Sequence, residues 1–149
     1  MTTIHNTVLN ALRDRTLVTL APDQSVREAA SILSRHTIGA APVLVGNRLV
    51  GVFSERDVLQ RVVAACLDPD ATLVSAVMTS NPRTIIGDAS LTKAFAIMIE
   101  GNFRHLPVVD ATGRVVSMLS MRDVPLEYRI MQQRWSEWTN CKAAAAAEA

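Results

Sequence analysis

The stretch Gly51-Val-Phe-Ser-Glu-Arg-Asp-Val58 returns 66 residues later as Ser117-Met-Leu-Ser-Met-Arg-Asp-Val124. In both copies an apolar run ends in a serine, and an aspartate follows three positions later. An apolar run of this kind predicts a buried strand, and Ser-x-x-Asp predicts the start of a helix with the serine as its N-cap. The chain therefore contains two strand-to-helix junctions of the same kind.

The repetition extends over most of the chain. When the sequence is moved against itself by 65 residues, residues 18–44 align with residues 83–109. One extra residue in the second copy changes the offset to 66, and residues 48–58 then align with residues 114–124. A duplication of this length indicates two similar structural units. Identical pairs in the first block are Thr19/Thr84, Asp23/Asp88, Ser25/Ser90, Ala29/Ala94, Ile32/Ile97, Pro42/Pro107 and Val43/Val108.

Each copy predicts the element order β-α-β-β-α. Short extended segments at residues 17–20 and 84–86 precede helices that begin at Ser25 and Ser90. Paired apolar runs at 41–45 with 49–53, and at 106–109 with 115–119, predict two hairpins. A second helix is expected after Ser54 and after Ser120. We therefore expect a mixed α/β (α+β) fold of two pseudo-symmetric units packed sheet to sheet, at residues 14–66 and 77–128.

Three further segments lie outside the repeats. Residues 4–13 predict a short lead helix, and residues 129–141 predict a C-terminal helical extension of the second unit. Tyr128, Met131, Trp135 and Trp138 follow one another at spacings of 3, 4 and 3, which places them on one helix face. That stripe either covers an edge of the protein's own core or forms a dimer contact. The low-complexity tail 142–149 is left out of the fold prediction.

Composition excludes several classes of protein. Of the 149 residues, 49% are hydrophobic and the net charge is only +1, which argues against a disordered chain and against a nucleic-acid partner. Two cysteines are too few for a disulfide scaffold, and no metal-ligand or catalytic-triad spacing occurs. No apolar run is long enough to cross a membrane. We expect a cytoplasmic protein that is not an enzyme.

The Ser-x-x-Asp motifs allow two interpretations. The first is structural, because serine and aspartate at these positions form a capping box and suit the helix dipole. The second is ligand binding, because a carboxylate can accept hydrogen bonds from both hydroxyls of a ribose, and free N–H groups at a helix N-terminus favour phosphate.

The repeated architecture and its motifs resemble the tandem cystathionine-β-synthase (CBS) domain pair, or Bateman module. Besides the two junctions, the segments Gly101-Asn-Phe-Arg-His-Leu-Pro-Val-Val-Asp110 and Val77-Met-Thr-Ser-Asn-Pro-Arg-Thr84 are similar to signatures of that family. The resemblance implies a regulatory module that binds an adenosyl ligand, of the AMP, ADP, ATP, NAD(H) or S-adenosylmethionine class, between its two domains. No obligatory cofactor is implied.

The resemblance also implies which residues form the two clefts. One cleft would combine Ser54 and Asp57 with Thr84 and Ile85, and its counterpart would combine Ser120 and Asp123 with Thr19 and Leu20. In each cleft the aspartate would hold the ribose.

Positive charge for the phosphates is expected from the segment Phe103-Arg104-His105, with Arg56 as a further candidate. An alternative places Arg104 and His105 in a solvated turn. Gly39 and Ala40 occupy the corresponding positions of the first copy, and Ser117 replaces the motif glycine Gly51. The two clefts are therefore not equivalent, and we expect the Asp57 cleft to be the better occupied.

Two functions remain in competition at this point. The first is a non-catalytic sensor of an adenine nucleotide, expected to form a homodimer and to regulate an enzyme or transporter outside this chain. The second is an oligomerisation or partner-docking module in which one or both nucleotide sites are degenerate.

Overall fold

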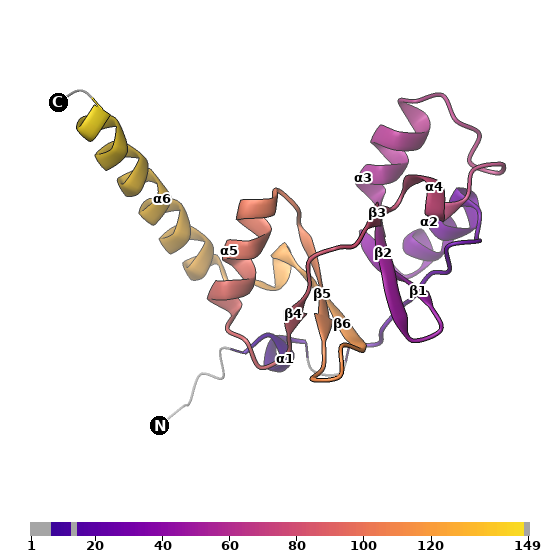
Figure 1. Ribbon diagram of the computed structural model, residues 1–149, viewed down its shortest axis with the longest axis horizontal. Coiled ribbons are helices and arrows are strands. Elements are labelled where there is room, and N and C mark those ends of the chain that lie inside the picture. Colours follow the sequence, from indigo (N-terminus) through magenta and orange to yellow (C-terminus); the bar gives the residue numbers. More distant parts are fainter. Residues whose placement is uncertain (1–6, 13–14, 148–149) are drawn as a thin grey trace.

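Two structural units lie side by side in the computed structural model, and a long helix, α6 (Leu126–Ala147), projects away from the second unit (Figure 1). The structure describes residues 7–12 and 15–147. Each unit contains a three-stranded sheet and its own apolar core, as the duplicated sequence predicts.

The first unit is built on the hairpin of β1 (Ala40–Val45) and β2 (Arg48–Ser54), which is extended by the short strand β3 (Thr79–Ser80). The turn at Gly46 has a positive φ of 61°, which glycine adopts without strain. Helix α2 (Val26–Arg35) begins in a capping box, in which Ser25 and Glu28 satisfy each other's backbone N–H groups. Other elements of this unit are α3 (Glu55–Asp57), the π-helical segment η1 (Val58–Val63) and α4 (Val74–Val77).

The second unit repeats this plan. Strand β4 (Ile85–Ile86) pairs in parallel with β5 (His105–Val109), and β5 pairs antiparallel with β6 (Val115–Ser120). Helix α5 (Leu91–Gly101) begins at the N-cap Ser90 and packs its apolar face on this sheet. The two units meet where β1 contacts β6.

The predicted first strand at residues 17–20 is not formed as a strand. Only Leu20 makes a bridge, in parallel with Val43, through the backbone bonds Leu20 N to Pro42 O and Leu44 N to Leu20 O, both 2.9 Å. Residues 15–19 form no strand, and residues 15–18 line a pocket between the units. In the second copy the strand begins at Ile85, one residue later than predicted.

The helix expected directly after Ser120 is also shorter than predicted. A single 3₁₀ turn, η2 (Met121–Asp123), is followed by extended backbone at Val124, and α6 begins only after Pro125. Proline disfavours helical backbone in the residue before it, so Pro125 separates the two helical segments. Helix α6 then continues to Ala147, into the alanine-rich tail that was left out of the fold prediction, because alanine has the highest helix propensity.

The lead helix is α1 (Val8–Ala11), and it packs into the core of the second unit rather than the first. Val8 N donates to Ala89 O at 2.9 Å and Leu9 N donates to Gly87 O at 2.8 Å. Helix α4 makes the matching contacts in the first unit, where Val74 N donates to Gln24 O at 2.9 Å. Residues 4–6 and 13 of the predicted lead helix, and the boundary residue 14, lie outside the described residues.

Candidate functional site

Two pockets lie between the units, each at one of the duplicated strand-to-helix junctions. The Asp57 pocket has a volume of about 450 Å³ and the Asp123 pocket about 740 Å³. Both volumes fall within the roughly 300–1,000 Å³ of small-molecule sites. The Asp57 pocket brings together six of the residues singled out in the sequence: Ser54, Arg56, Asp57, Phe103, Arg104 and His105.

Asp57 is held by its own helix start. Its Oδ2 accepts hydrogen bonds from Ser54 N at 2.8 Å and from Ser54 Oγ at 3.0 Å, which completes a capping box. Its Oδ1 lies 3.6 Å from Arg61 Nε, too far for a hydrogen bond. Arg61 itself donates to Val77 O at 2.9 Å and to Met78 O at 3.0 Å. The cap therefore uses one oxygen of the carboxylate and orients the whole group.

Asp123 has a similar cap but a different neighbour. Ser120 N donates to its Oδ2 at 2.7 Å, which again completes a capping box. Arg15, from the start of the first unit, donates to both carboxylate oxygens at 2.8 and 2.6 Å. The hydrogen bond to Asp123 raises the pKa of the Arg15 guanidinium. Asp123 is therefore bound from across the cleft, whereas Asp57 is not.

Four residues line both pockets: Gly39, Glu55, Arg104 and His105. A Cβ built on Gly39 would stand 3.2 Å from His105 Cε1 and 3.2 Å from Glu55 Oε1. The backbone is pseudo-symmetric at this point, because Glu55 N donates to Gly39 O at 2.9 Å and Met121 N donates to Arg104 O at 2.8 Å. The charge is asymmetric, since the second copy supplies Arg104 and His105 where the first has Gly39 and Ala40.

His105 is half-buried at this shared position. Burial lowers its pKa below the ordinary value of histidine, and the nearby negative charge of Glu55 partly opposes that shift. The neutral imidazole is therefore favoured in the unliganded protein.

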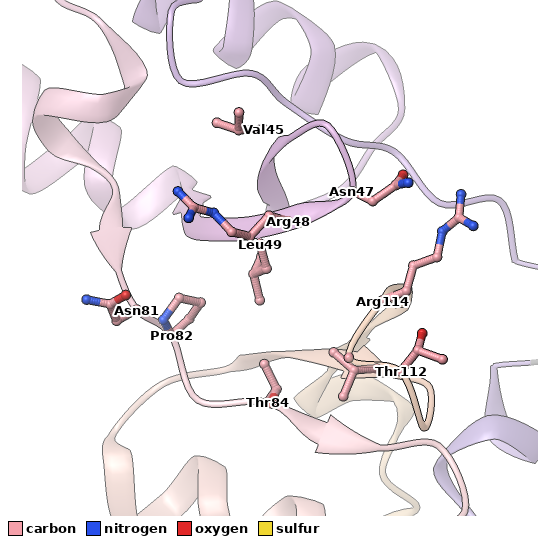
Figure 2. A pocket seen from close by; sticks show the side chains of 11 residues that line it. Val45, Asn47, Arg48, Leu49, Asn81, Pro82, Thr84, Thr112 and Arg114 are labelled. Carbon is pink, nitrogen blue, oxygen red and sulfur yellow. The ribbon is translucent and has the colours of Figure 1, made fainter.

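The four first-strand residues expected in the clefts lie elsewhere. Leu20 and Ile85 are buried in the two cores, and Thr19 lines neither the Asp57 pocket nor the Asp123 pocket. Thr84 instead lines a more open pocket between the turns of the two hairpins, of about 860 Å³ (Figure 2). Figure 2 shows Arg48 and Arg114 on the two facing hairpins of this pocket.

The residues that take these places come a few positions earlier in the chain. Thr79, Asn81, Pro82 and Arg83 line the Asp57 pocket, and residues 15–18 line the Asp123 pocket. The signal for the first group was present in the segment Val77–Thr84 that opens the second repeat. What the sequence did not show is how far each segment runs along the cleft before it enters its sheet.

Gly51 and Ser117 differ for a steric reason. A Cβ on Gly51 would stand 2.5 Å from Met78 Sδ and 2.9 Å from Thr79 O, because β3 pairs closely with β2 at this point. The three-stranded order β4-β5-β6 leaves β6 at the sheet's edge, and Ser117 is accommodated there as a buried residue that lines the Asp123 pocket.

Within residues 7–12 and 15–147, no group of three His, Cys, Asp or Glu side chains is placed to hold a metal ion. No helix in this part of the chain combines the length and the hydropathy needed to span a membrane.

Comparison with protein families gives one clear match. The model of the CBS domain matches residues 10–64 and again residues 74–124. A CBS domain-containing protein of Arabidopsis thaliana, CBSCBSPB1, is 37% identical over 134 residues, which cover 80% of this chain and 25% of that protein. The chain spans about a quarter of the length of this relative and of two similar CBS domain-containing proteins of Arabidopsis thaliana.

Solved structures agree with this match. A signal-transduction protein with CBS domains from Burkholderia ambifaria is 31% identical, with a TM-score of 0.75 over 79% of this chain and 90% of that one. A CBS domain protein from Pyrobaculum aerophilum, complexed with AMP, is 32% identical, with a TM-score of 0.75 over 85% of this chain and 96% of that one.

Proposed function

The chain belongs to the CBS-domain family, as a tandem pair, and from this premise we propose that it is a non-catalytic regulatory module that binds an adenine nucleotide in the Asp57 pocket. The observation that carries the proposal is the convergence of an oriented carboxylate, Asp57, with the cationic side chains of Arg56, Arg83 and Arg104 in one cleft between the two units. The AMP bound by the Pyrobaculum aerophilum relative supports the ligand class.

Each part of a nucleotide finds a chemical counterpart in this pocket. The Asp57 carboxylate can accept hydrogen bonds from the two ribose hydroxyls. Arg104, with Arg56 and Arg83 nearby, can neutralise a phosphate, and guanidinium groups bind phosphate with paired N–H donors. Val52, Pro82 and Pro107 offer apolar surface for a planar base.

Thermal unfolding with and without AMP tests it. A ligand that binds only the folded protein, at a concentration a hundredfold above its Kd, stabilises it by about 2.7 kcal/mol. We expect AMP to raise the melting temperature of the wild type and Asp57→Asn to abolish most of the gain, because an amide accepts fewer hydrogen bonds from ribose.

The matched control is Asp23→Asn, which changes an exposed carboxylate that lines neither cleft. It should retain the full shift. The proposal is refuted if AMP, ADP, ATP, NADH and S-adenosylmethionine all leave the melting temperature unchanged at millimolar concentration.

A second candidate function, self-association, is favoured by α6. Of the stripe that the sequence predicts, only Tyr128 packs against the second core, so the expectation that the stripe covers the protein's own core is wrong beyond that residue. Met131, Trp135 and Trp138 are 67%, 61% and 50% exposed. Their spacing with Tyr128 is that of the a and d positions of a coiled coil.

We propose that this face pairs with the same face of a second copy, which would make the module a homodimer. The centroids of the Trp135 and Trp138 rings lie 5.2 Å apart, with the ring planes tilted by 33°, and Lys142 Nζ lies 4.2 Å from the centroid of the Trp138 ring. Whether an enzyme or a transporter is regulated, and the cytoplasmic location, stay predictions.

A further inference from the structure

In the Asp123 pocket, the carboxylate is bound by a residue from a distant part of the chain. Arg15 Nη1 donates to Asp123 Oδ2 at 2.8 Å and Arg15 Nη2 donates to Oδ1 at 2.6 Å. The two residues stand 108 positions apart in the sequence. The Asp123 side chain is 12% exposed and the Arg15 side chain 44% exposed, so the pair is formed at the mouth of the cleft, with the carboxylate on the inside.

Both carboxylate oxygens are therefore engaged. Together with the bond from Ser120 N to Oδ2 at 2.7 Å, Asp123 accepts three short hydrogen bonds. Paired arginine–carboxylate bonds are among the stronger polar interactions in proteins, and a partly buried pair is less screened than an exposed one. A ribose that used this carboxylate would first have to displace the guanidinium.

The Asp57 pocket has no equivalent contact from its crossing segment. The residues that this segment contributes beside Asp57 are Thr79, Asn81 and Pro82. Arg83, the next residue, is directed to Glu100, at 3.5 Å between Nη1 and Oε2. The nearest ion-pair partner of Asp57 is Arg61 of the following helical segment, at 3.6 Å. Both side chains are largely buried, at 9% exposure for Asp57 and 12% for Asp123. The difference is that both oxygens of Asp123 accept hydrogen bonds from an arginine across the cleft, whereas Oδ1 of Asp57 accepts none from its crossing segment.

We propose that Arg15 is a latch that keeps the Asp123 pocket closed to nucleotide, so that each chain binds one ligand, at Asp57. This inference rests on the proposed function, because it concerns which of two similar clefts the ligand enters. Arg15 controls access to this pocket by binding Asp123, and it thereby determines which of the two clefts the nucleotide enters. Its release would open a second site without any change in the fold.

Isothermal titration with AMP tests the latch by stoichiometry. We expect one AMP per chain for the wild type and two for Arg15→Gln, which keeps side-chain length but removes the charge and the paired donors. Adding Asp123→Asn to Arg15→Gln should return the stoichiometry to one. Arg27→Gln is the matched control, since it breaks the exposed ion pair of Arg27 with Asp70, outside both clefts, and should leave the stoichiometry at one.

The outcomes separate this inference from the proposed function. A stoichiometry of one for Arg15→Gln, with binding still lost in Asp57→Asn, overturns the latch and leaves the proposed function intact. Two sites in the wild type overturn the latch as well. If the wild type binds no AMP, Asp57 is not an AMP site. The latch then stands only if Arg15→Gln gains one AMP site that Asp123→Asn removes, and it falls if Arg15→Gln gains none. Thermal unfolding of each variant shows that it is folded.

Discussion

At the scale of single residues, the two interpretations of the Ser-x-x-Asp motif turn out to be compatible. Ser54 with Asp57, and Ser120 with Asp123, both form capping boxes. In both, the aspartate uses only Oδ2 for the cap, but the Oδ1 of Asp123 is bonded to Arg15, whereas the Oδ1 of Asp57 is not hydrogen-bonded to Arg61, its nearest cation. Because the cap holds one oxygen in place, the other oxygen is already positioned before a ligand binds. Binding then costs little side-chain entropy, so a fixed carboxylate accepts hydrogen bonds from hydroxyls more favourably than a mobile one.

His105 provides a prediction at the same scale. Burial lowers its pKa, opposed by Glu55, with further contributions from Arg104, Arg122 and Asp123. In the range below the ordinary histidine pKa of about 6.5, the unfolded chain therefore binds more protons than the folded one. Stability then rises with pH in this range and falls as the pH is lowered through it.

We expect the urea midpoint of the wild type to fall more between pH 7.5 and pH 5.5 than that of His105→Gln, which cannot take up this proton. His36→Gln serves as the control, because His36 is exposed at the end of α2. If His105→Gln loses as much stability as the wild type over this interval, burial of the neutral imidazole is not the cause.

At the scale of helices and strands, the sequence was most informative where the signals are local. The capping box at Ser25 and the two hairpins follow from residues within a few positions of one another. The end of the helix after Ser120 was mispredicted, although Pro125 carried the signal, because the apolar pattern runs through the proline without interruption. Whether α6 is exposed depends on whether another part of the folded protein packs against it, and the local sequence pattern does not contain that information.

The exposed face of α6 gives the prediction for this scale. Replacing Trp135 and Trp138 together by alanine removes the two large side chains of the stripe while preserving helix propensity. Sedimentation velocity should show a dimer for the wild type and a monomer for the double variant. Arg134→Ala with Gln133→Ala changes two neighbours outside the stripe and should remain dimeric. A wild type that sediments as a monomer at all concentrations contradicts the proposed pairing.

At the scale of the whole molecule, the duplication predicted two units, and the family resemblance predicted a cleft between them with the aspartates in it. The partners expected for the aspartates, Thr19 and Thr84, also came from the resemblance. They line neither the Asp57 pocket nor the Asp123 pocket, because the contacts depend on where each crossing segment enters its sheet. The sequence did not predict the role of Arg15 for the same reason: its contact with Asp123 joins the start of the first unit to the end of the second.

The same crossing of segments makes the two units interdependent. Helix α1 precedes the first repeat, yet Val8 and Leu12 are buried in the core of the second, at 0% and 5% exposure. Leu12→Ala should therefore destabilise the protein by about 2–5 kcal/mol, the usual cost of removing a buried leucine side chain. Leu9→Ala, on the same helix but 50% exposed, should cost less than about 1 kcal/mol.

Hydrogen exchange distinguishes this arrangement from a lead helix that belongs to the first repeat. If α1 completes the second core, Leu12→Ala should accelerate amide exchange in α5 and β5 before it does so in α2 and β1. The reverse order, or equal acceleration in both units, would place the lead helix with its own repeat. The proposed latch gives a related prediction, because Arg15 follows Leu12 by only three residues. If Leu12→Ala loosens α1, it should also weaken the hydrogen bonds of Arg15 with Asp123. A second AMP should then bind to Leu12→Ala but not to Leu9→Ala.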